Sequence, residues 1–273
     1  MALENKELSL LHLQELVADI KQKKELRDIS NAFVLKELET VLRKEPKLLK
    51  ELGLHWNPRS SAYATIVKKV REKLRRVYGL FRVVEKGKTL QTHPSTQERE
   101  SFYQELYRKL FAITGKPKVI LDLGCGVNPF SFPFMKLREV EYYAYDLSQE
   151  EIGIINSYFK KQHEKNPAVA GKASLLDITD LQMISKLPKA KVALLFKVTD
   201  VLDRNKGHMV TEEVLKAIPA KYMVVSFSTR TMSGKPMTAP RRRWMEWLCQ
   251  RLGWKYNILE FENELFYVIR KNQ

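Results

Sequence analysis

The sequence has few cysteines, scattered histidines and no long apolar run. Cys125 and Cys249 are its only cysteines, too few for a disulfide framework and without partners at the spacing of a zinc site. The five histidines form no metal-binding pattern either. No stretch of about 18 apolar residues could span a bilayer, and the first 28 residues lack the apolar core of a secretory signal. We therefore expect a cytoplasmic protein with reduced thiols, no metal and no membrane association.

Acidic residues are also under-represented. The 273 residues include 48 Lys and Arg against 32 Asp and Glu, which gives a formal net charge of +16. Such an excess points to a polyanionic partner, most simply a nucleic acid, although an anionic membrane surface would also fit the composition. The length allows one large α/β domain and a smaller accessory domain.

The first 90 residues contain amphipathic helical patterns and no convincing strand. A predicted helix over about 61–78 places Ile66, Val70, Leu74 and Val77 on one face. From Arg59 to Lys88 there are ten Lys and Arg against two Glu, half of the net charge of the chain. A solvated helix face is the plain alternative, but in so basic a chain we favour a surface that contacts phosphates. The candidate contacts are Arg59, Lys68, Lys69, Arg71, Lys73, Arg75 and Arg76.

Strands and helices alternate in the rest of the chain. Strands are expected at 118–123, 141–145, 172–176, 191–197 and 221–227, which predicts a parallel sheet with helices on both faces. The last two runs, 254–260 and 265–270, are separated by a short polar link and predict an antiparallel hairpin. This arrangement is typical of class I, Rossmann-like methyltransferases. We predict such an α/β domain over 91–273, preceded by a small all-helical domain over 1–90.

The most informative motif is Val119-Ile-Leu-Asp-Leu-Gly-Cys-Gly-Val-Asn-Pro129, an apolar run that enters a Gly-x-Gly turn. Asp146 follows a second strand, twenty residues beyond Gly126, where an acidic residue would meet ribose hydroxyls. A dinucleotide fingerprint needs a third glycine three residues after Gly126, but Pro129 stands there, which weakens that interpretation. S-adenosylmethionine has no pyrophosphate and tolerates this turn. Asp177 follows the third strand, where adenine would be read, although such a residue is more often a helix cap.

Three separated motifs carry a family resemblance. They are His93-Pro-Ser-Thr-Gln-Glu-Arg99, Gly115-Lys-Pro-Lys-Val-Ile-Leu-Asp-Leu-Gly-Cys-Gly-Val-Asn-Pro129 and Val225-Ser-Phe-Ser-Thr-Arg-Thr-Met-Ser-Gly-Lys235. Together they resemble the aminoglycoside-resistance 16S ribosomal RNA methyltransferases that modify N7 of guanine 1405. The resemblance is clearest from about 90 to 270, and the N-terminal part matches in character and length only. It implies S-adenosylmethionine as cofactor, 16S rRNA within the 30S subunit as substrate, and docking on that subunit by the helical domain. We expect a monomer.

The resemblance also implies roles for single residues. Arg99 would pair with the methionine carboxylate, Gly124 and Gly126 would line the cofactor, and Asp146 would bind the ribose. Asp177 and Ile178 would frame the adenine, with Asp122, Cys125, Leu147 and Phe196 completing the cofactor site. Lys197 would face the methyl-transfer centre and Arg230 the target nucleotide. Guanine N7 has a lone pair and no proton to lose, so no general base is expected.

The segment Arg241-Arg-Arg-Trp244 is a further candidate for RNA contact, through Arg241, Arg242 and Arg243. At helical spacing, Trp244, Trp247 and Leu248 are predicted to lie in the core. The chain departs from the family at Asp200 and Ser228, where proline is common. These departures concern the placement of the target more than the cofactor site.

Other functions stay open from the sequence. The enzyme could modify another RNA or another atom of ribosomal RNA, and the sequence does not separate these possibilities. A non-catalytic RNA-binding protein on this scaffold is disfavoured because the acidic cofactor residues are present. A small-molecule methyltransferase would leave the basic helix without a role.

Overall fold

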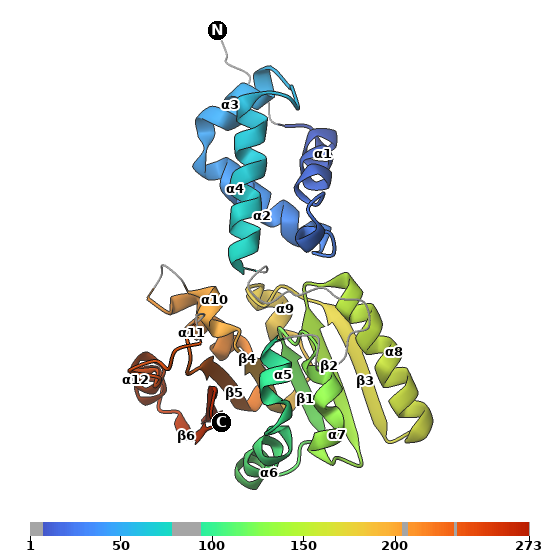
Figure 1. Ribbon diagram of the computed structural model, residues 1–273, viewed down its shortest axis with the longest axis vertical. Helices are drawn as coiled ribbons and strands as arrows, with labels where there is room; N and C mark the ends of the chain where they lie inside the picture. The colour runs from blue at the N-terminus through green and yellow to red at the C-terminus, as the bar shows by residue number, and fades with distance from the viewer. Residues whose placement is uncertain (1–7, 78–93, 204–206, 232–233, 273) are drawn as a thin grey trace. The chain divides into compact units, whose positions relative to one another are not determined.

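The computed structural model describes residues 8–77, 94–203, 207–231 and 234–272 (Figure 1). The chain divides into two compact units, Met1–Val84 and Glu85–Gln273. Each unit has its own apolar core. The predicted domain boundary at residue 90 lies outside the described residues.

The N-terminal unit is helical where it is described. Its helices are α1 (Leu10–Ile20), η1 (Lys24–Leu26), α2 (Asn31–Lys44), α3 (Pro46–Leu54) and α4 (Ser61–Val77). The predicted helix near 61–78 is confirmed as α4, which packs against α1, α2 and α3. Its buried face carries Ile66, Val70 and Leu74, each four residues apart and therefore on one side of the helix. Helix α3 was not predicted; it begins at Pro46, a residue whose fixed φ and missing N–H suit a first helical position.

The C-terminal unit contains a seven-stranded sheet in the order β3-β2-β1-β4-β5-β7-β6. The strands are β1 (Val119–Leu123), β2 (Val140–Asp146), β3 (Val169–Leu175), β4 (Ala190–Phe196), β5 (Ala220–Ser228), β6 (Lys255–Glu260) and β7 (Glu264–Arg270). The first five are parallel, and β7 is antiparallel to both β5 and β6. The predicted Rossmann-like methyltransferase fold with its C-terminal hairpin is confirmed.

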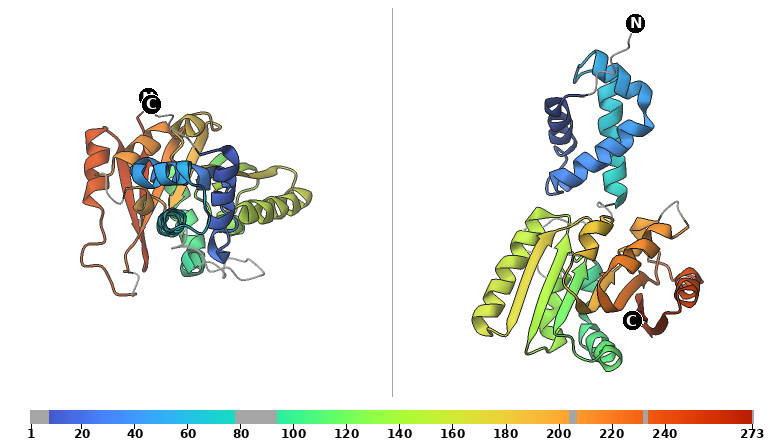
Figure 2. Two further views of the ribbon diagram at one scale, coloured as in Figure 1. Left: turned by 90° about the horizontal axis from the view of Figure 1, so that it is seen from above. Right: turned by 180° about the vertical axis from the view of Figure 1, so that it is seen from behind.

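Helices cover both faces of this sheet, because successive side chains of each strand point to opposite sides. On β1, Ile120 joins the core under one helical layer, while Leu121 and Leu123 join the core on the other side. The first layer holds α6 (Tyr103–Thr114), α7 (Phe132–Met135) and α8 (Gln149–Lys165), and Figure 1 is viewed from this side. The second holds α9 (Leu181–Ser185), α11 (Met209–Ala217) and α12 (Arg243–Arg251); Figure 2 adds the view from behind.

Two short segments differ from simple strand–helix alternation. After β1 the chain forms η4 (Asn128–Ser131) and then the brief α7. Before β1, α5 (Pro94–Glu100) and α6 are separate helices. No helix in the described ranges is both long enough and apolar enough to cross a membrane.

Candidate active site

The carboxyl ends of the parallel strands bring most of the predicted cofactor residues to one edge of the sheet. Strand register places Leu123 beside Tyr145, Asp146 beside Leu175, and Phe196 beside Ser226. Residues that immediately follow β1, β2, β3 and β4 therefore emerge together. This edge of an open α/β sheet is where ligands bind in doubly wound folds.

The glycine turn after β1 is pinned to the neighbouring strand. The backbone N–H groups of Gly124 and Cys125 both donate to the carbonyl of Tyr145, at 2.9 and 3.0 Å. Gly124 and Gly126 have φ of 67° and 48°, in the left-handed region that favours glycine. A Cβ on Gly124 would lie 2.7 Å from the Val198 side chain, whereas a Cβ on Gly126 would meet no atom within 4 Å. The turn is thus closed on one side and open at Gly126.

Asp146 is locked beside this turn. Its Oδ2 accepts a hydrogen bond from the Gly126 N–H at 2.9 Å. Its Oδ1 accepts from the backbone N–H groups of Leu147 and Ser148, at 2.7 and 3.1 Å. These three backbone donors fix the orientation of the carboxylate, whose two oxygens provide about four acceptor positions in all.

Asp177 forms a local turn at the end of β3. Its Oδ1 accepts hydrogen bonds from the N–H and the hydroxyl of Thr179, at 2.9 and 2.8 Å. The cap of α9 is supplied by Asp180, whose Oδ1 accepts from the Met183 N–H at 3.1 Å. Asp177 is therefore not the cap of that helix, and Ile178 beside it is half-buried.

Arg99 is buried and paired with a residue that the sequence analysis did not single out. Its Nε and Nη2 donate to the two carboxylate oxygens of Glu264 at 2.7 and 2.8 Å, and the side chains are 2% and 0% exposed. The guanidinium carbon lies 4.9 Å from the centre of the Phe196 ring, a cation–π geometry. The hydroxyl of Ser226 also donates to Glu264. A glutamate at the start of an apolar strand was the available sign that Glu264 has a buried partner.

Lys197 follows β4 in a left-handed conformation, with φ of 58°. Its backbone N–H donates to the Ser226 hydroxyl at 2.9 Å. Its Nζ donates to Glu98 at 2.5 Å and lies 3.7 Å from the Glu264 carboxylate. The side chain is only 12% exposed, so its charge is fixed next to the Arg99–Glu264 pair.

Buried polar groups form a hydrogen-bonded network next to the glycine turn. Asp122 Oδ2 accepts hydrogen bonds from Asn128 and from the Tyr142 hydroxyl, at 2.9 and 2.6 Å. The Tyr103 hydroxyl in turn donates to Asn128 at 3.0 Å, so α6 is joined to the segment after β1. Burial raises the pKa of Asp122 to about 6, against the opposing effect of these hydrogen bonds. Asp122 is 1% exposed, which makes it a support of the site. Tyr103 and Asn128 were not predicted.

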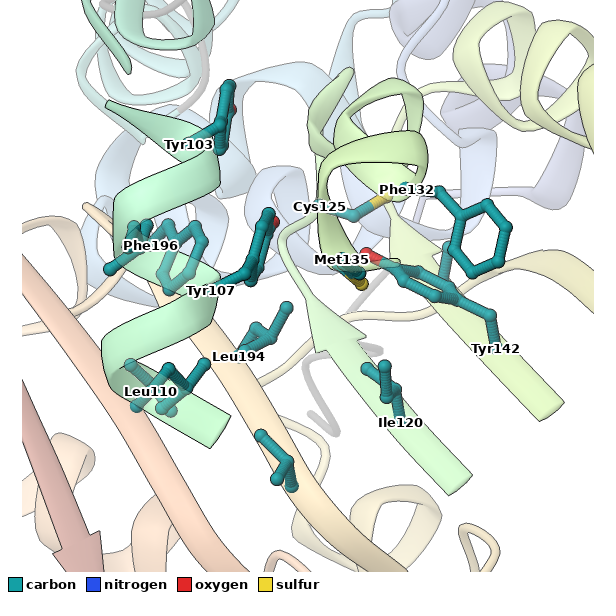
Figure 3. Packing of buried hydrophobic residues seen from close by; sticks show 14 of the residues in the cluster. Tyr103, Tyr107, Leu110, Ile120, Cys125, Phe132, Met135, Tyr142, Leu194 and Phe196 are labelled. Carbon is teal, nitrogen blue, oxygen red and sulfur yellow. The ribbon is translucent and has the colours of Figure 1, made fainter. Parts of the chain in front are cut away.

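Aromatic packing holds the same region together. Figure 3 shows Tyr103, Tyr107 and Leu110 along α6, facing side chains of the sheet and of the segment after β1. The Tyr107 and Ser131 hydroxyls are 2.6 Å apart. The segment that follows the turn is therefore braced by the aromatic side chains of α6.

Neither cysteine has the character of a reactive thiol. Cys125 and Cys249 are both free and buried. Burial raises the pKa of the Cys125 thiol well above its usual range, so it stays protonated near neutral pH and lines the turn as a small apolar group. Among the described residues, no group of three or more His, Cys, Asp or Glu side chains could hold a metal ion.

Arg230 lies on the loop after β5. Its Nη2 donates to Glu262 at 3.1 Å, its Nη1 donates to the Gly234 carbonyl at 3.3 Å, and its side chain is 40% exposed. It is therefore accessible but oriented by the turn between β6 and β7.

The three arginines at 241–243 do not form one surface. Arg243 is exposed, and Arg241 is 54% exposed while it pairs with Glu246 at 2.9 Å. Arg242 is only 15% exposed, and its guanidinium bonds within the protein. It therefore differs from the exposed phosphate contact that the run of arginines suggested.

The prediction for the tryptophans of α12 was wrong in one case. Leu248 is buried, and Trp244 stacks on His208 with ring centres 3.8 Å apart. Trp247 is 65% exposed, because its position on the helix points away from the sheet.

The basic face of α4 in the N-terminal unit is partly neutralised. Lys69 pairs with Glu45, Lys73 with Glu37, and Arg75 with Glu25. Arg71 donates to the carbonyls of Asp19 and Ile20 at the end of α1. Arg59 and Lys68 are exposed and form no ion pair with any residue of the described ranges, and the side chain of Arg76 lies outside the description.

Comparisons with known proteins agree with this architecture. Over 189 residues, the chain is 28% identical to a 16S rRNA (guanine(1405)-N(7))-methyltransferase of Proteus mirabilis, which covers 67% of this chain and 64% of that protein. It is 28% identical over 190 residues to the protein of the same name from Micromonospora rosea, covering 67% of the chain and 65% of that protein. The matched part thus spans slightly less than two thirds of each relative.

Solved structures share the fold. An rRNA methylase from Escherichia coli matches 95% of this chain and 100% of its own, with a TM-score of 0.68 and 21% identity. The 16S rRNA methyltransferase RmtF, solved in complex with S-adenosyl-L-homocysteine, matches 97% of this chain and 100% of its own, with a TM-score of 0.69 and 22% identity.

The family model described as ribosomal RNA methyltransferase (FmrO) matches residues 27–268. That span includes the glycine turn, Asp146 and the Arg99–Glu264 pair, together with most of both units. The chain therefore belongs to the FmrO family of ribosomal RNA methyltransferases.

Proposed function

We propose that this protein transfers the methyl group of S-adenosylmethionine to N7 of guanine 1405 in 16S rRNA of the 30S subunit. Membership of the ribosomal RNA methyltransferase family and the names of the relatives support this reaction. The observation that carries the proposal is the Gly126–Asp146 contact at the carboxyl edge of the sheet. A host that carries this modification is expected to resist aminoglycosides.

The residues at this edge fit the cofactor. Gly126 has open space where a side chain would be, so the turn admits a ligand against its backbone. Asp146 is held as an acceptor for the ribose hydroxyls, while Leu147, Asp177 and Ile178 are the candidates to frame the adenine. Arg99, beside Phe196, is the candidate to pair with the methionine carboxylate. It would share its charge with Glu264, to which it already donates, and Lys197 next to this pair is balanced by Glu98.

The reaction needs alignment more than proton transfer. S-adenosylmethionine, when bound, supplies an electrophilic methyl group on a sulfonium sulfur. Guanine N7 offers a lone pair in the plane of the ring, so the chain does not need a general base. The protein's task is to hold the nucleophile in line with the methyl carbon and to exclude other orientations. The rigid contacts of Lys197 and of Arg230 suit that task.

The target base must also leave its stack. In A-form RNA the N7 edge faces a deep, narrow major groove that side chains cannot enter. The enzyme must therefore distort the helix or extrude the nucleotide. Arg230 is the candidate for contact with the displaced nucleotide or its phosphate, while Arg59, Lys68 and Arg243 are exposed candidates for contact with the RNA backbone.

Methyl transfer from labelled S-adenosylmethionine tests the proposal. The protein is incubated separately with 30S subunits, naked 16S rRNA and tRNA, and the product is mapped by borohydride–aniline cleavage. We expect label in 30S subunits and cleavage at guanine 1405. Label without cleavage at that nucleotide assigns another target, and no label on any RNA, with S-adenosylhomocysteine still bound, overturns the enzymatic function.

A further inference from the structure

Arg242 connects two loops at the carboxyl edge of the sheet. One loop follows β4 and carries Asp200 at the start of α10 (Thr199–Leu202). The other runs from β5 to α12 and carries Arg230. Arg242 Nη2 lies 3.6 Å from the Asp200 carboxylate and donates to the Ser228 carbonyl at 3.4 Å, while Nη1 donates to the Pro240 carbonyl at 2.9 Å.

The Arg242 guanidinium also packs against apolar side chains. Its carbon lies 5.1 Å from the centre of the Phe227 ring, and the Met237 sulfur is 3.8 Å from Nη1. With 15% of its side chain exposed, Arg242 must lose several of these contacts before it can reach a phosphate. An arginine suits this position because its planar fork bonds several acceptors at once, which a lysine ammonium cannot reproduce.

The loop that Arg242 holds is the loop that orients Arg230. The Ser228 hydroxyl donates to the Arg230 carbonyl at 2.8 Å and accepts from the Arg230 N–H at 3.2 Å. Across the loop, Met237 N–H donates to the Thr229 carbonyl at 2.8 Å. Ser228 therefore touches both Arg242 and Arg230, and a shift at one is transmitted to the other.

We propose that Arg242 and Asp200 form a latch that positions the loop after β5, so that Arg230 and the target nucleotide are placed correctly relative to Lys197. This role rests on the proposed methyl transfer for its effect on catalysis, although the latch itself is a property of the protein alone. Arg242 is thus a positioning residue and not an RNA contact. Asp200 acts through Arg242 and has no separate role in the reaction.

Backbone hydrogen exchange tests the latch without any RNA. The reporters are the amide protons of Met237 and Thr231, which donate to Thr229 and Lys235 across the loop. We expect Asp200→Asn and Arg242→Gln to speed their exchange about tenfold, because the loop opens locally more often. Asp200→Glu, which keeps the carboxylate, restores slow exchange. Unchanged exchange in Asp200→Asn and Arg242→Gln overturns the latch whether or not the protein methylates RNA.

Kinetics separate positioning from phosphate contact. For Arg242→Gln we expect kcat on the RNA substrate to fall about tenfold to a hundredfold, as for a misplaced reactant, with S-adenosylhomocysteine affinity unchanged. Asp200→Asn should lower kcat in the wild-type background and have no further effect when Arg242 is already Gln. Arg242→Lys keeps the charge but not the fork, and should behave like Arg242→Gln.

The exposed neighbour Arg243 provides the matched control. Arg243→Gln should reduce the slope of log affinity against log salt by roughly one, as for the loss of a phosphate contact. Arg242→Gln should leave that slope unchanged. An equal loss of slope in both variants, or rescue by Arg242→Lys, identifies Arg242 as an RNA contact and overturns the proposal. If wild-type protein methylates no RNA, the proposed function fails, and hydrogen exchange still decides the latch.

Discussion

Arg99 and Glu264 form a bidentate ion pair inside the protein, with hydrogen bonds of 2.7 and 2.8 Å between residues 165 positions apart. The pair joins α5 to the first residue of β7. It also sets the guanidinium beside Phe196, at the end of β4. The ion pair thus connects α5, the end of β4 and the C-terminal hairpin of β6 and β7 at the candidate cofactor site.

Breaking this pair should be costly. Glu264→Gln leaves the buried Arg99 without its counter-ion, and removal of one partner of a buried pair typically costs about 3–5 kcal/mol. We expect the free energy of unfolding in urea to fall by about that amount, with weaker binding of S-adenosylhomocysteine. Glu262→Gln is the control on the same turn, because its partner Arg230 is 40% exposed and such surface pairs contribute at most about 1 kcal/mol. Equal losses in the two variants would contradict the prediction.

Asp146 should govern cofactor affinity. Backbone N–H groups donate to both of its oxygens, so the amide nitrogen of Asp146→Asn would have to face at least one of these donors. We expect the dissociation constant for S-adenosylhomocysteine, measured by calorimetry, to rise about tenfold or more, as for a lost hydrogen bond to a charged group. Asp180→Asn is the matched control, because asparagine also caps α9. Unaltered affinity in Asp146→Asn would exclude Asp146 from the site.

The parts of this site that the sequence predicted are those defined by local patterns. Apolar runs located the strands, and the glycine turn with Asp146 twenty residues later follows from one strand–helix–strand unit. Glu264 and Ser226 escaped prediction because the Arg99–Glu264 pair and the hydrogen bond from Ser226 to Glu264 depend on β7 pairing with β5, far along the chain. Arg242 escaped for a different reason: in a run of arginines, nothing in the sequence distinguishes the buried guanidinium from its exposed neighbours.

Protonation of Asp122 should make stability depend on pH. Its folded-state pKa of about 6 exceeds the value of about 4 for an unfolded aspartate. The stability from this group is therefore fully present below about pH 4 and is lost as the pH rises through about 6, a change on the order of 2 kcal/mol. We expect the unfolding free energy of the wild type, relative to that of Asp122→Asn, to fall between about pH 4 and about pH 7. A constant difference across this range would contradict the assigned pKa.

Lys197 should show the cost of a left-handed backbone. At φ of 58°, an alanine keeps the unfavourable contact of its Cβ with the backbone, whereas a glycine does not. We expect the free energy of unfolding, measured in urea, to be about 1 kcal/mol higher for Lys197→Gly than for Lys197→Ala. The order should reverse at Lys160, an exposed residue inside α8, because alanine stabilises a helix interior by about 0.5–1 kcal/mol over glycine. Alanine as the more stable residue at both positions would show that Lys197 carries no backbone strain.

Two cations of the N-terminal unit should contribute to RNA binding more than their neighbours. Arg59 and Lys68 are exposed and pair with no carboxylate of the described residues, whereas Lys69 and Arg75 already pair with Glu45 and Glu25. A cation in an ion pair must give up that partner to bind a phosphate, so its net contribution is smaller. We expect Arg59→Gln with Lys68→Gln to reduce the salt slope of 30S binding by roughly two. Cofactor affinity should stay unchanged, because neither residue belongs to the unit that carries the glycine turn. The matched pair Lys69→Gln with Arg75→Gln should reduce the slope less, and the opposite ranking would show that the ion pairs within the unit do not persist when RNA is bound.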